Sequence, residues 1–196
     1  MFWLIIVIAL WGIVHSLLAS LEFKEILRRA LGDRFMSFYR LLYNLFATVS
    51  FLPVLYLMVT LPDQPLYHVP APWRFLMLAG QGLSALLLLA AVLQTDALSF
   101  AGLRQLFEEE KPGRLVTGGL YRFVRHPLYT FGLVALWLSP SMTINSFIVY
   151  VALTIYILIG AIFEERKLLR LFGQEYARYK SMTPMLLPGL KLGGNK

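Results

Sequence analysis

Residues 128–163 read LYTFGLVALWLSPSMTINSFIVYVALTIYILIGAIF, and none of their side chains is charged. Pro140 and its flanking serines divide this stretch into Leu128–Ser139 and Ile144–Phe163. The second part has the roughly 20 apolar residues that a helix needs to cross a bilayer, whereas the first part is shorter. The stretch therefore predicts a tight helical hairpin in a membrane, either spanning or re-entrant.

Three more apolar segments precede the hairpin, at Phe2–Ser20, Phe38–Leu61 and Trp73–Gln94. The chain of 196 residues is 58% hydrophobic and 15% charged, which is too apolar for a soluble domain. Backbone groups inside a bilayer must be satisfied by helices or by closed barrels, and these uniform runs lack the alternation of a barrel strand. We predict an all-α, polytopic integral membrane protein with about five transmembrane helices, in a single membrane domain over residues 1–196.

The basic residues predict the orientation of the spans. Of the 18 lysines and arginines, only Arg74 falls on the side opposite to all the others. The others follow the first, third and last spans: Lys24, Arg28, Arg29, Arg34, Arg40, Arg104, Lys111, Arg114, Arg122, Arg125, Arg166, Lys167, Arg170, Arg178, Lys180, Lys191 and Lys196. The positive-inside rule then places the N-terminus outside and the C-terminus in the cytoplasm, in what we expect to be a bacterial inner membrane.

Composition and motifs argue against several classes of function. The net charge of +7 is typical of inner loops that attract anionic lipids, so we expect no nucleic-acid partner. The chain has no cysteine, and its histidines (His15, His68 and His126) lack the spacing of metal ligands, so we expect no metal. His15 lies within the first span, where it either has a function or merely forms a hydrogen bond to a neighbouring helix.

One candidate site segment spans residues 113–129, GRLVTGGLYRFVRHPLY. Because His126 precedes a proline, it is expected to be extended, and Pro127 suits the first turn of a helix. A helix start favours an anion such as a carboxylate, and the Arg125 guanidinium can hold a carboxylate with two hydrogen bonds. The alternative is that these arginines only obey the positive-inside rule.

The second segment spans residues 164–179, EERKLLRLFGQEYARY. Glu164 and Glu165 stand where the last apolar span ends, and acidic residues near a helix C-terminus oppose its dipole. A cation, an amine or ribose hydroxyls would explain them, and so would salt bridges to Arg125, Arg166 or Lys167. Residues 167–180 mix apolar and charged side chains in a pattern that predicts an interfacial amphipathic helix.

Together these segments resemble the membrane methyltransferase family that includes isoprenylcysteine carboxyl methyltransferase and the phospholipid N-methyltransferases. The resemblance rests on Gly119-Leu120-Tyr121, Arg125-His126-Pro127-Leu128-Tyr129, Glu164-Glu165 through Leu168, Phe172-Gly173, Tyr176, Tyr179 and Leu187-Pro188. It divides the chain into N-terminal helices and loops at 1–110 and a methyltransferase motif region at 111–188. Features of the N-terminal half, such as His15-Ser16 and Tyr43-Asn44, are similar to the bacterial branch near the methanethiol S-methyltransferases.

The resemblance implies S-adenosyl-L-methionine as methyl donor and an acceptor that arrives from the membrane. The residues that it implies for binding the donor are Arg114, Leu115, Val116, Tyr121, His126, Pro127, Leu128 and Tyr129, with the glutamate pair, Glu164 and Glu165, closing the pocket. We predict that Arg125 and Glu164 position the reactants as catalytic residues.

One departure from the family pattern bears on the acceptor. Carboxyl methyltransferases of this family place an arginine about one turn before the glutamate pair, where this chain has Gly160 and Ala161. We therefore predict methyl transfer to a small or lipophilic nucleophile at the cytoplasmic membrane face, with a thiol favoured and membrane lipids as surroundings. The alternatives are carboxyl or phospholipid N-methylation, or a non-catalytic scaffold or carrier that retains the fold.

Overall fold

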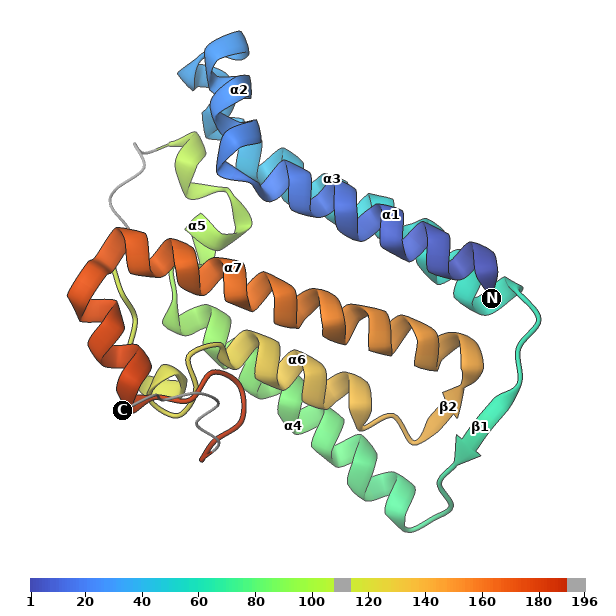
Figure 1. The fold of residues 1–196 in the computed structure, drawn as a ribbon. Helices are drawn as coiled ribbons and strands as arrows, with labels where there is room; N and C mark the ends of the chain where they lie inside the picture. The colour runs from blue at the N-terminus through green and yellow to red at the C-terminus, as the bar shows by residue number, and fades with distance from the viewer. Residues whose placement is uncertain (108–113, 190–196) are drawn as a thin grey trace. The chain divides into compact units, whose positions relative to one another are not determined.

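The computed structural model describes residues 1–107 and 114–189, and it is built almost wholly of helices (Figure 1). The predicted boundary at 110/111, together with Lys111, Gly113, Lys191 and Lys196, lies outside these ranges. Four helices are long and apolar enough to span a membrane, and a fifth apolar helix, α6, is shorter. The four are α1 (Phe2–Ala19), α3 (Asp33–Thr60), α4 (Trp73–Gln94) and α7 (Ile144–Met182), and α6 is Pro127–Trp137. The all-α, polytopic fold class is confirmed.

The chain forms two compact units, of which the first contains residues 1–66, 96–107 and 143–153. Leu4, Ile8, Val54 and Val149 make its apolar core. Toward the C-terminal end of α1, the His15 Nε2 lies 2.6 Å from the Tyr43 hydroxyl, and the His15 ring stacks on Trp11. The sequence left two interpretations of His15, a function and a hydrogen bond to a neighbouring helix. The structure shows the hydrogen bond.

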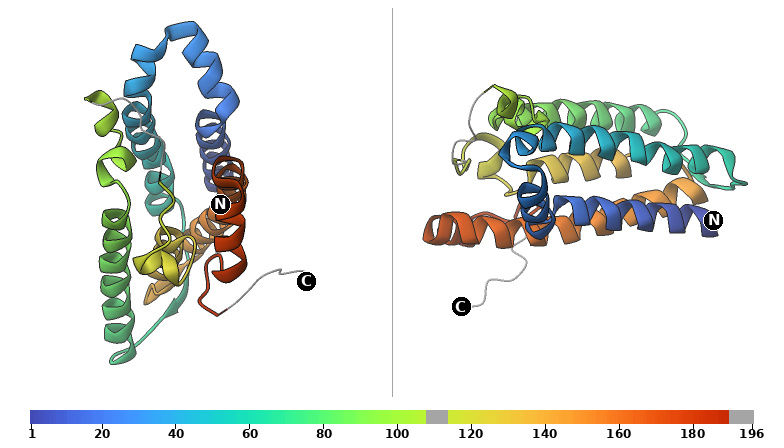
Figure 2. Two further views of the ribbon diagram at one scale, coloured as in Figure 1. Left: turned by 90° about the vertical axis from the view of Figure 1, so that its left-hand side faces the viewer. Right: turned by 90° about the horizontal axis from the view of Figure 1, so that it is seen from above.

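A short helix, α2 (Leu21–Leu31), bridges the ends of α1 and α3 where we expected only a loop (Figure 2). The Ser20 side chain begins α2 by accepting a hydrogen bond from the Phe23 N–H at 3.2 Å. Gly32, at φ 79°, ends it, so that α3 starts at Asp33 rather than at Phe38. The apolar and the charged side chains of α2 lie on opposite faces of that helix, and none of them is buried. The chain therefore has an amphipathic helix in the first loop as well as one near its C-terminus.

In the second unit (residues 67–95, 114–142 and 154–189), α6 packs against α4 (Figure 1). The Gln81 side-chain amide donates to the Ala135 carbonyl at 2.8 Å. At the other end of α4, the Gln94 side chain accepts from the Leu120 N–H at 2.7 Å, within the 3₁₀ helix η2 (Gly119–Arg122). α6 has 11 residues and is about 16 Å long, so α6 alone is too short to pack along the whole of α4. Together, α6 and η2 follow α4 along its length.

The connection after α6 lies beside the segment that leads into α4. The Tyr67 hydroxyl and the Val69 N–H donate to the carbonyls of Ser139 and Pro140, each at 2.9 Å. These contacts belong to the region where β1 (Pro65–His68) pairs with β2 (Ser141–Thr143). α6 therefore ends beside the segment that leads into α4, and the choice between a spanning and a re-entrant hairpin stays a prediction.

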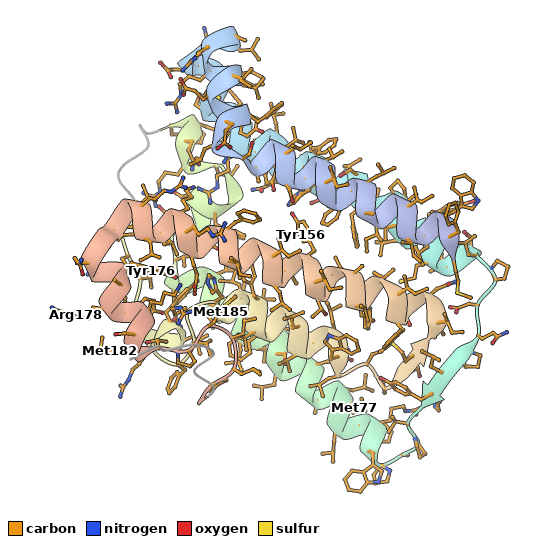
Figure 3. The ribbon with its side chains drawn as sticks, in the orientation of Figure 1. Met77, Tyr156, Tyr176, Arg178, Met182 and Met185 are labelled. Carbon is orange, nitrogen blue, oxygen red and sulfur yellow. The ribbon has the colours of Figure 1, made fainter. Side chains whose placement is uncertain are left out.

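The helix α7 continues beyond its apolar part, which ends at Phe163, and bends sharply at Gly173. Gly173 has φ 50° and ψ −122°, a conformation that glycine adopts most readily. After the bend, residues 174–182 return with Tyr176 and Tyr179 buried and Arg178 exposed, and Figure 3 shows Tyr176 and Arg178 on opposite sides. The predicted amphipathic helix at 167–180 is thus the end of α7, divided at Gly173.

Candidate active site at the start of α6

The backbone between η2 and α6 has the predicted form. His126 is the N-cap residue at φ −125° and ψ 66°, and Pro127 is the first residue of α6. The Thr130 N–H donates to the His126 carbonyl at 3.0 Å, and proline has no N–H. The first turn of α6 therefore presents the N–H groups of Leu128 and Tyr129 at the positive end of the helix dipole.

Glu165 is at the centre of a buried cluster of charges. Its carboxylate accepts from the Arg125 Nε at 2.6 Å and from Lys180 Nζ at 2.7 Å, and only 7% of its side chain is exposed. The His126 Nε2 lies 3.6 Å from the same carboxylate. The sequence offered two explanations for the glutamate pair, a bound ligand and salt bridges. For Glu165, the structure shows the salt bridge to Arg125.

These contacts determine the protonation of Glu165. Burial alone would raise the pKa of its carboxyl. The nearby His126 ring and the hydrogen bonds from Lys180 and Arg125 outweigh burial and hold its pKa at about 2, below the ordinary value of 4.5. Glu165 therefore stays ionised at neutral pH, and its negative charge is matched by the surrounding cations.

The lowered pKa of Glu165 predicts a loss of stability in acid. Between about pH 4.5 and pH 2 the unfolded chain binds a proton at this residue that the folded chain does not, so stability falls as the pH is lowered through this window. We expect a loss on the order of 3 kcal/mol, measured by thermal unfolding of the detergent-purified protein. The Glu165→Gln variant should lack this part of the pH dependence. An equal acid loss in the variant would contradict the assignment.

Glu164 has different surroundings from Glu165. Its side chain is 44% exposed, and its Oε2 accepts a hydrogen bond from the Tyr129 hydroxyl at 2.7 Å. The His126 Nδ1 lies 3.6 Å from the same oxygen, and the His126 and Tyr129 rings stack with centroids 5.2 Å apart. The start of α6 and the glutamate pair of α7, which the sequence separates by more than 30 residues, therefore meet in one place.

Tyr121, in η2, also lies near the cluster. Burial, and after it the negative charge of Glu164, raises the pKa of Tyr121 to about 12. Its phenol therefore remains neutral and can donate a hydrogen bond. The Tyr121 carbonyl accepts from the Tyr179 hydroxyl at 2.5 Å, which joins η2 to the returning end of α7.

Residues 183–186 form a strap across the start of α6 that sequence reasoning missed. The Arg125 and His126 N–H groups donate to the Pro184 and Met185 carbonyls at 2.9 and 3.2 Å. The Thr130 hydroxyl donates to the Leu186 carbonyl at 2.8 Å, and the Arg125 guanidinium to the Thr183 carbonyl. The only sequence signal for this strap was the Leu187-Pro188 pair that closes the motif.

Not every predicted site residue joins this cluster. Arg114 is exposed, and within residues 1–107 and 114–189 no hydrogen bond or ion pair links Arg114, Leu115 or Val116 to the glutamates. Arg125 is 8% exposed and is held by Glu165 and by backbone carbonyls, so its role as a ligand for an incoming carboxylate stays a prediction. Within the same ranges, no three metal-binding side chains cluster, and the expectation of no metal likewise stays a prediction.

Similarity to known proteins bears on what this cluster does. The family model of the phospholipid methyltransferases matches residues 75–175, just over half of the chain. Methanethiol S-methyltransferase 1 of Bradyrhizobium diazoefficiens is 32% identical over 94% of this chain and 65% of its own length. The methanethiol S-methyltransferase of Pseudomonas deceptionensis is 36% identical over 54% of this chain and 42% of its own. That of Mycobacterium tuberculosis is 30% identical over 94% of this chain and 76% of its own.

These matches extend well beyond the short motifs, although the chain spans no more than about two thirds of the first two relatives. No solved structure matches the chain significantly. The family model covers most of α4, all of α6 and most of α7, including Arg125, His126 and the glutamate pair. The chain therefore belongs to the phospholipid methyltransferase family.

Proposed function

We propose that this integral membrane protein transfers a methyl group from S-adenosyl-L-methionine to a small thiol at the inner face of the membrane. The observation that carries the proposal is the meeting of the α6 start with Glu164, where Glu164 Oε2 lies 3.6 Å from His126 Nδ1. The relatives named methanethiol S-methyltransferases support the choice of a small thiol as acceptor.

The residues at the start of α6 fit the chemistry of the donor. Its carboxylate suits the N–H groups of Leu128 and Tyr129 at the positive helix end. The aromatic faces of Tyr121 and Tyr129 suit its adenine and sulfonium, since cations are attracted to such faces. We propose that these residues, with Arg114, Leu115, Val116, His126 and Pro127, hold the donor. The bound donor supplies a methyl group that its sulfonium has already activated.

The buried charges contribute to the site by holding its segments in position. We propose that Arg125 and Glu165 position other parts of the site and do not touch the donor. Arg125 holds the start of α6 against the strap, and Glu165 holds the start of α6 against α7. A site held in this way keeps donor and acceptor aligned and excludes water, which together can account for much of a methyl-transfer rate.

Two measurements test the proposed function. Calorimetry of the detergent-purified protein should show binding of S-adenosylhomocysteine, and headspace analysis should show dimethyl sulfide when methanethiol and the donor are supplied. Absence of binding at millimolar S-adenosylhomocysteine would end the proposal. Binding without any methylated sulfide, together with methylated head groups in the lipids of expressing cells, would replace the thiol by a phospholipid.

Gly160 gives a prediction about the size of the acceptor. It precedes Glu164 by one helical turn, and a Cβ added there would meet no atom within 4 Å. Because side chains on a helix lean toward its N-terminus, the Glu164 side chain lies over the turn that contains Gly160. We expect Gly160→Leu to reduce turnover of ethanethiol more than that of methanethiol, without changing S-adenosylhomocysteine affinity.

A matched control exists on α4. Gly82 is also a helical glycine whose added Cβ would meet no atom within 4 Å. Gly82→Leu should therefore leave both thiol activities and S-adenosylhomocysteine affinity unchanged. The prediction fails if Gly160→Leu has the same acceptor profile as Gly82→Leu.

A further inference from the structure

The first loop of the protein contains a helix that the proposed function does not use. A single residue, Ser20, separates α2 from α1, and a single residue, Gly32, separates α2 from α3. Both neighbouring helices are long and apolar enough to span a membrane. The two spans therefore hold α2 at the membrane surface, and Figure 1 shows α2 turned away from the axes of α1 and α3.

One face of α2 is apolar. It is formed by side chains at the spacing i, i+3, i+4, i+7 and i+8, which lie on one side of a helix: Phe23, Ile26, Leu27, Ala30 and Leu31. None of them is buried, and Ile26 and Leu31 are 63% and 53% exposed. Exposed aliphatic surface is unfavourable in water, so this face requires an apolar cover.

The opposite face of α2 is charged, and positive charge is in excess around it. Arg29 forms an ion pair with Glu25 at 3.0 Å, and Arg28 forms one with Asp33 at 3.4 Å. Residues 21–40 as a whole have five basic and three acidic side chains. Basic segments beside a membrane span attract negatively charged lipid head groups.

The two faces together fit a membrane surface. A helix with one apolar and one basic face lies in the plane of the interface, with its apolar side chains at the boundary of the acyl chains and its basic side chains among the head groups. Because α1 and α3 already hold α2 beside the bilayer, lipid is next to the apolar face without the recruitment of another protein.

We propose that α2 is a binding surface for anionic phospholipids, with its apolar face among the acyl chains and its basic side chains at the lipid phosphates. The proposal does not depend on the methyl-transfer reaction, and its test needs no turnover. It assigns a partner to the first loop, whereas the proposed function concerns the start of α6 and the glutamate pair.

The test uses single cysteines, which are specific reporters because the chain has none of its own. Ile26→Cys and Arg28→Cys are a matched pair, since both side chains are more than half exposed and point about 200° apart on the helix. In nanodiscs of phosphatidylcholine and phosphatidylglycerol, we expect a water-soluble maleimide to label Ile26→Cys at least roughly tenfold more slowly than Arg28→Cys. Both should react at the same rate in dodecyl sulfate. Equal rates in nanodiscs would overturn the proposal.

Fluorescence quenching identifies what covers the apolar face. A bimane group attached at position 26 should be quenched by lipids brominated on their acyl chains, and a bimane group at position 28 should be quenched much less. In equimolar mixtures, brominated phosphatidylglycerol should quench at position 26 at least roughly twice as strongly as brominated phosphatidylcholine, because the basic residues enrich the anionic lipid. Salt at about 1 M should remove this difference.

Two results would contradict the proposal at this stage. Slow labelling at position 26 without quenching by either brominated lipid would show that protein, such as a second copy of this chain, covers the apolar face. Equal quenching by the two lipids at low salt would show that α2 does not select anionic head groups.

Two further variants keep the proposal testable if Ile26→Cys does not fold. Ala30→Cys lies on the same face and is also exposed, so it should show the same slow labelling and the same quenching. Replacing Arg28, Arg29 and Arg34 by glutamine should remove the preference for phosphatidylglycerol while position 30 stays protected from the maleimide. An undiminished preference would refute the binding of head groups by these basic side chains.

Discussion

Glu165→Gln should destabilise the fold by about 3–5 kcal/mol, because breaking a buried ion pair by removing one partner leaves the other charge uncompensated. Arg125, 8% exposed, would keep its charge without the carboxylate that now faces it, and Lys180 would lose its partner as well. The measurement is the free energy of unfolding in detergent, obtained by denaturant titration. We expect methyl transfer to fall with it, since Arg125 also holds the strap against α6.

Glu164→Gln is the matched control for this substitution. It makes the same chemical change one residue earlier, at a side chain that is 44% exposed and accepts one hydrogen bond from Tyr129. Its stability should change by about 1 kcal/mol or less. Replacing both Arg125 and Glu165 by methionine should recover much of the lost stability, because no buried charge then lacks a partner. Equal stability of the two single glutamine variants would refute the prediction.

Gly102→Ala should be the most damaging small substitution in the first unit. Gly102 ends α5 (Ala97–Ala101) at φ 84°, and a Cβ there would meet the Leu41 backbone nitrogen at 2.5 Å and the Arg40 carbonyl carbon at 2.8 Å. Backbone atoms within α3 cannot rotate away as a side chain can. Left-handed strain of about 1–2 kcal/mol and overpacking of about 1–3 kcal/mol together predict a loss of about 3 kcal/mol.

The local consequence of Gly102→Ala can be measured separately. The Asn44 side-chain amide donates to the carbonyls of Phe100 and Ala101 at 3.0 and 3.1 Å, and displacement of α5 from α3 would break both bonds. Hydrogen exchange should therefore rise in residues 97–106. Gly32→Ala is the control, because Gly32 has φ 79° but its added Cβ would meet no atom within 4 Å. If Gly102→Ala and Gly32→Ala lose the same stability, the close approach of α5 and α3 does not contribute to the loss in Gly102→Ala.

Several elements could be predicted from the sequence because their cause is local. The uncharged stretch at 128–163 predicted the hairpin, and Pro127 predicted the start of α6. α2 was missed because its apolar face is short and interrupted by charges, so that it is too polar for a search of long apolar runs. The bend at Gly173 was missed because a glycine within a helical pattern is often tolerated without one.

Within the candidate site, the sequence indicated the residues but not how they divide the work. Glu164 and Glu165 are the same amino acid at adjacent positions, so no local pattern distinguishes them. The difference arises because successive residues on a helix point about 100° apart, which turns Glu165 toward Arg125 and leaves Glu164 exposed beside Tyr129.

The amino-acid sequence by itself determined that this protein lies in a membrane, that it is all helical and which two segments carry its family pattern. Those properties follow from hydrophobicity, charge and residue identity, which act within a few turns of the chain. Only the tertiary structure decided that Arg125 and Lys180 neutralise Glu165, that residues 183–186 cross the start of α6 and that Glu164 stays accessible. These contacts join residues far apart in sequence, and electrostatic pairing in a buried place depends on which groups the fold brings within a few ångströms.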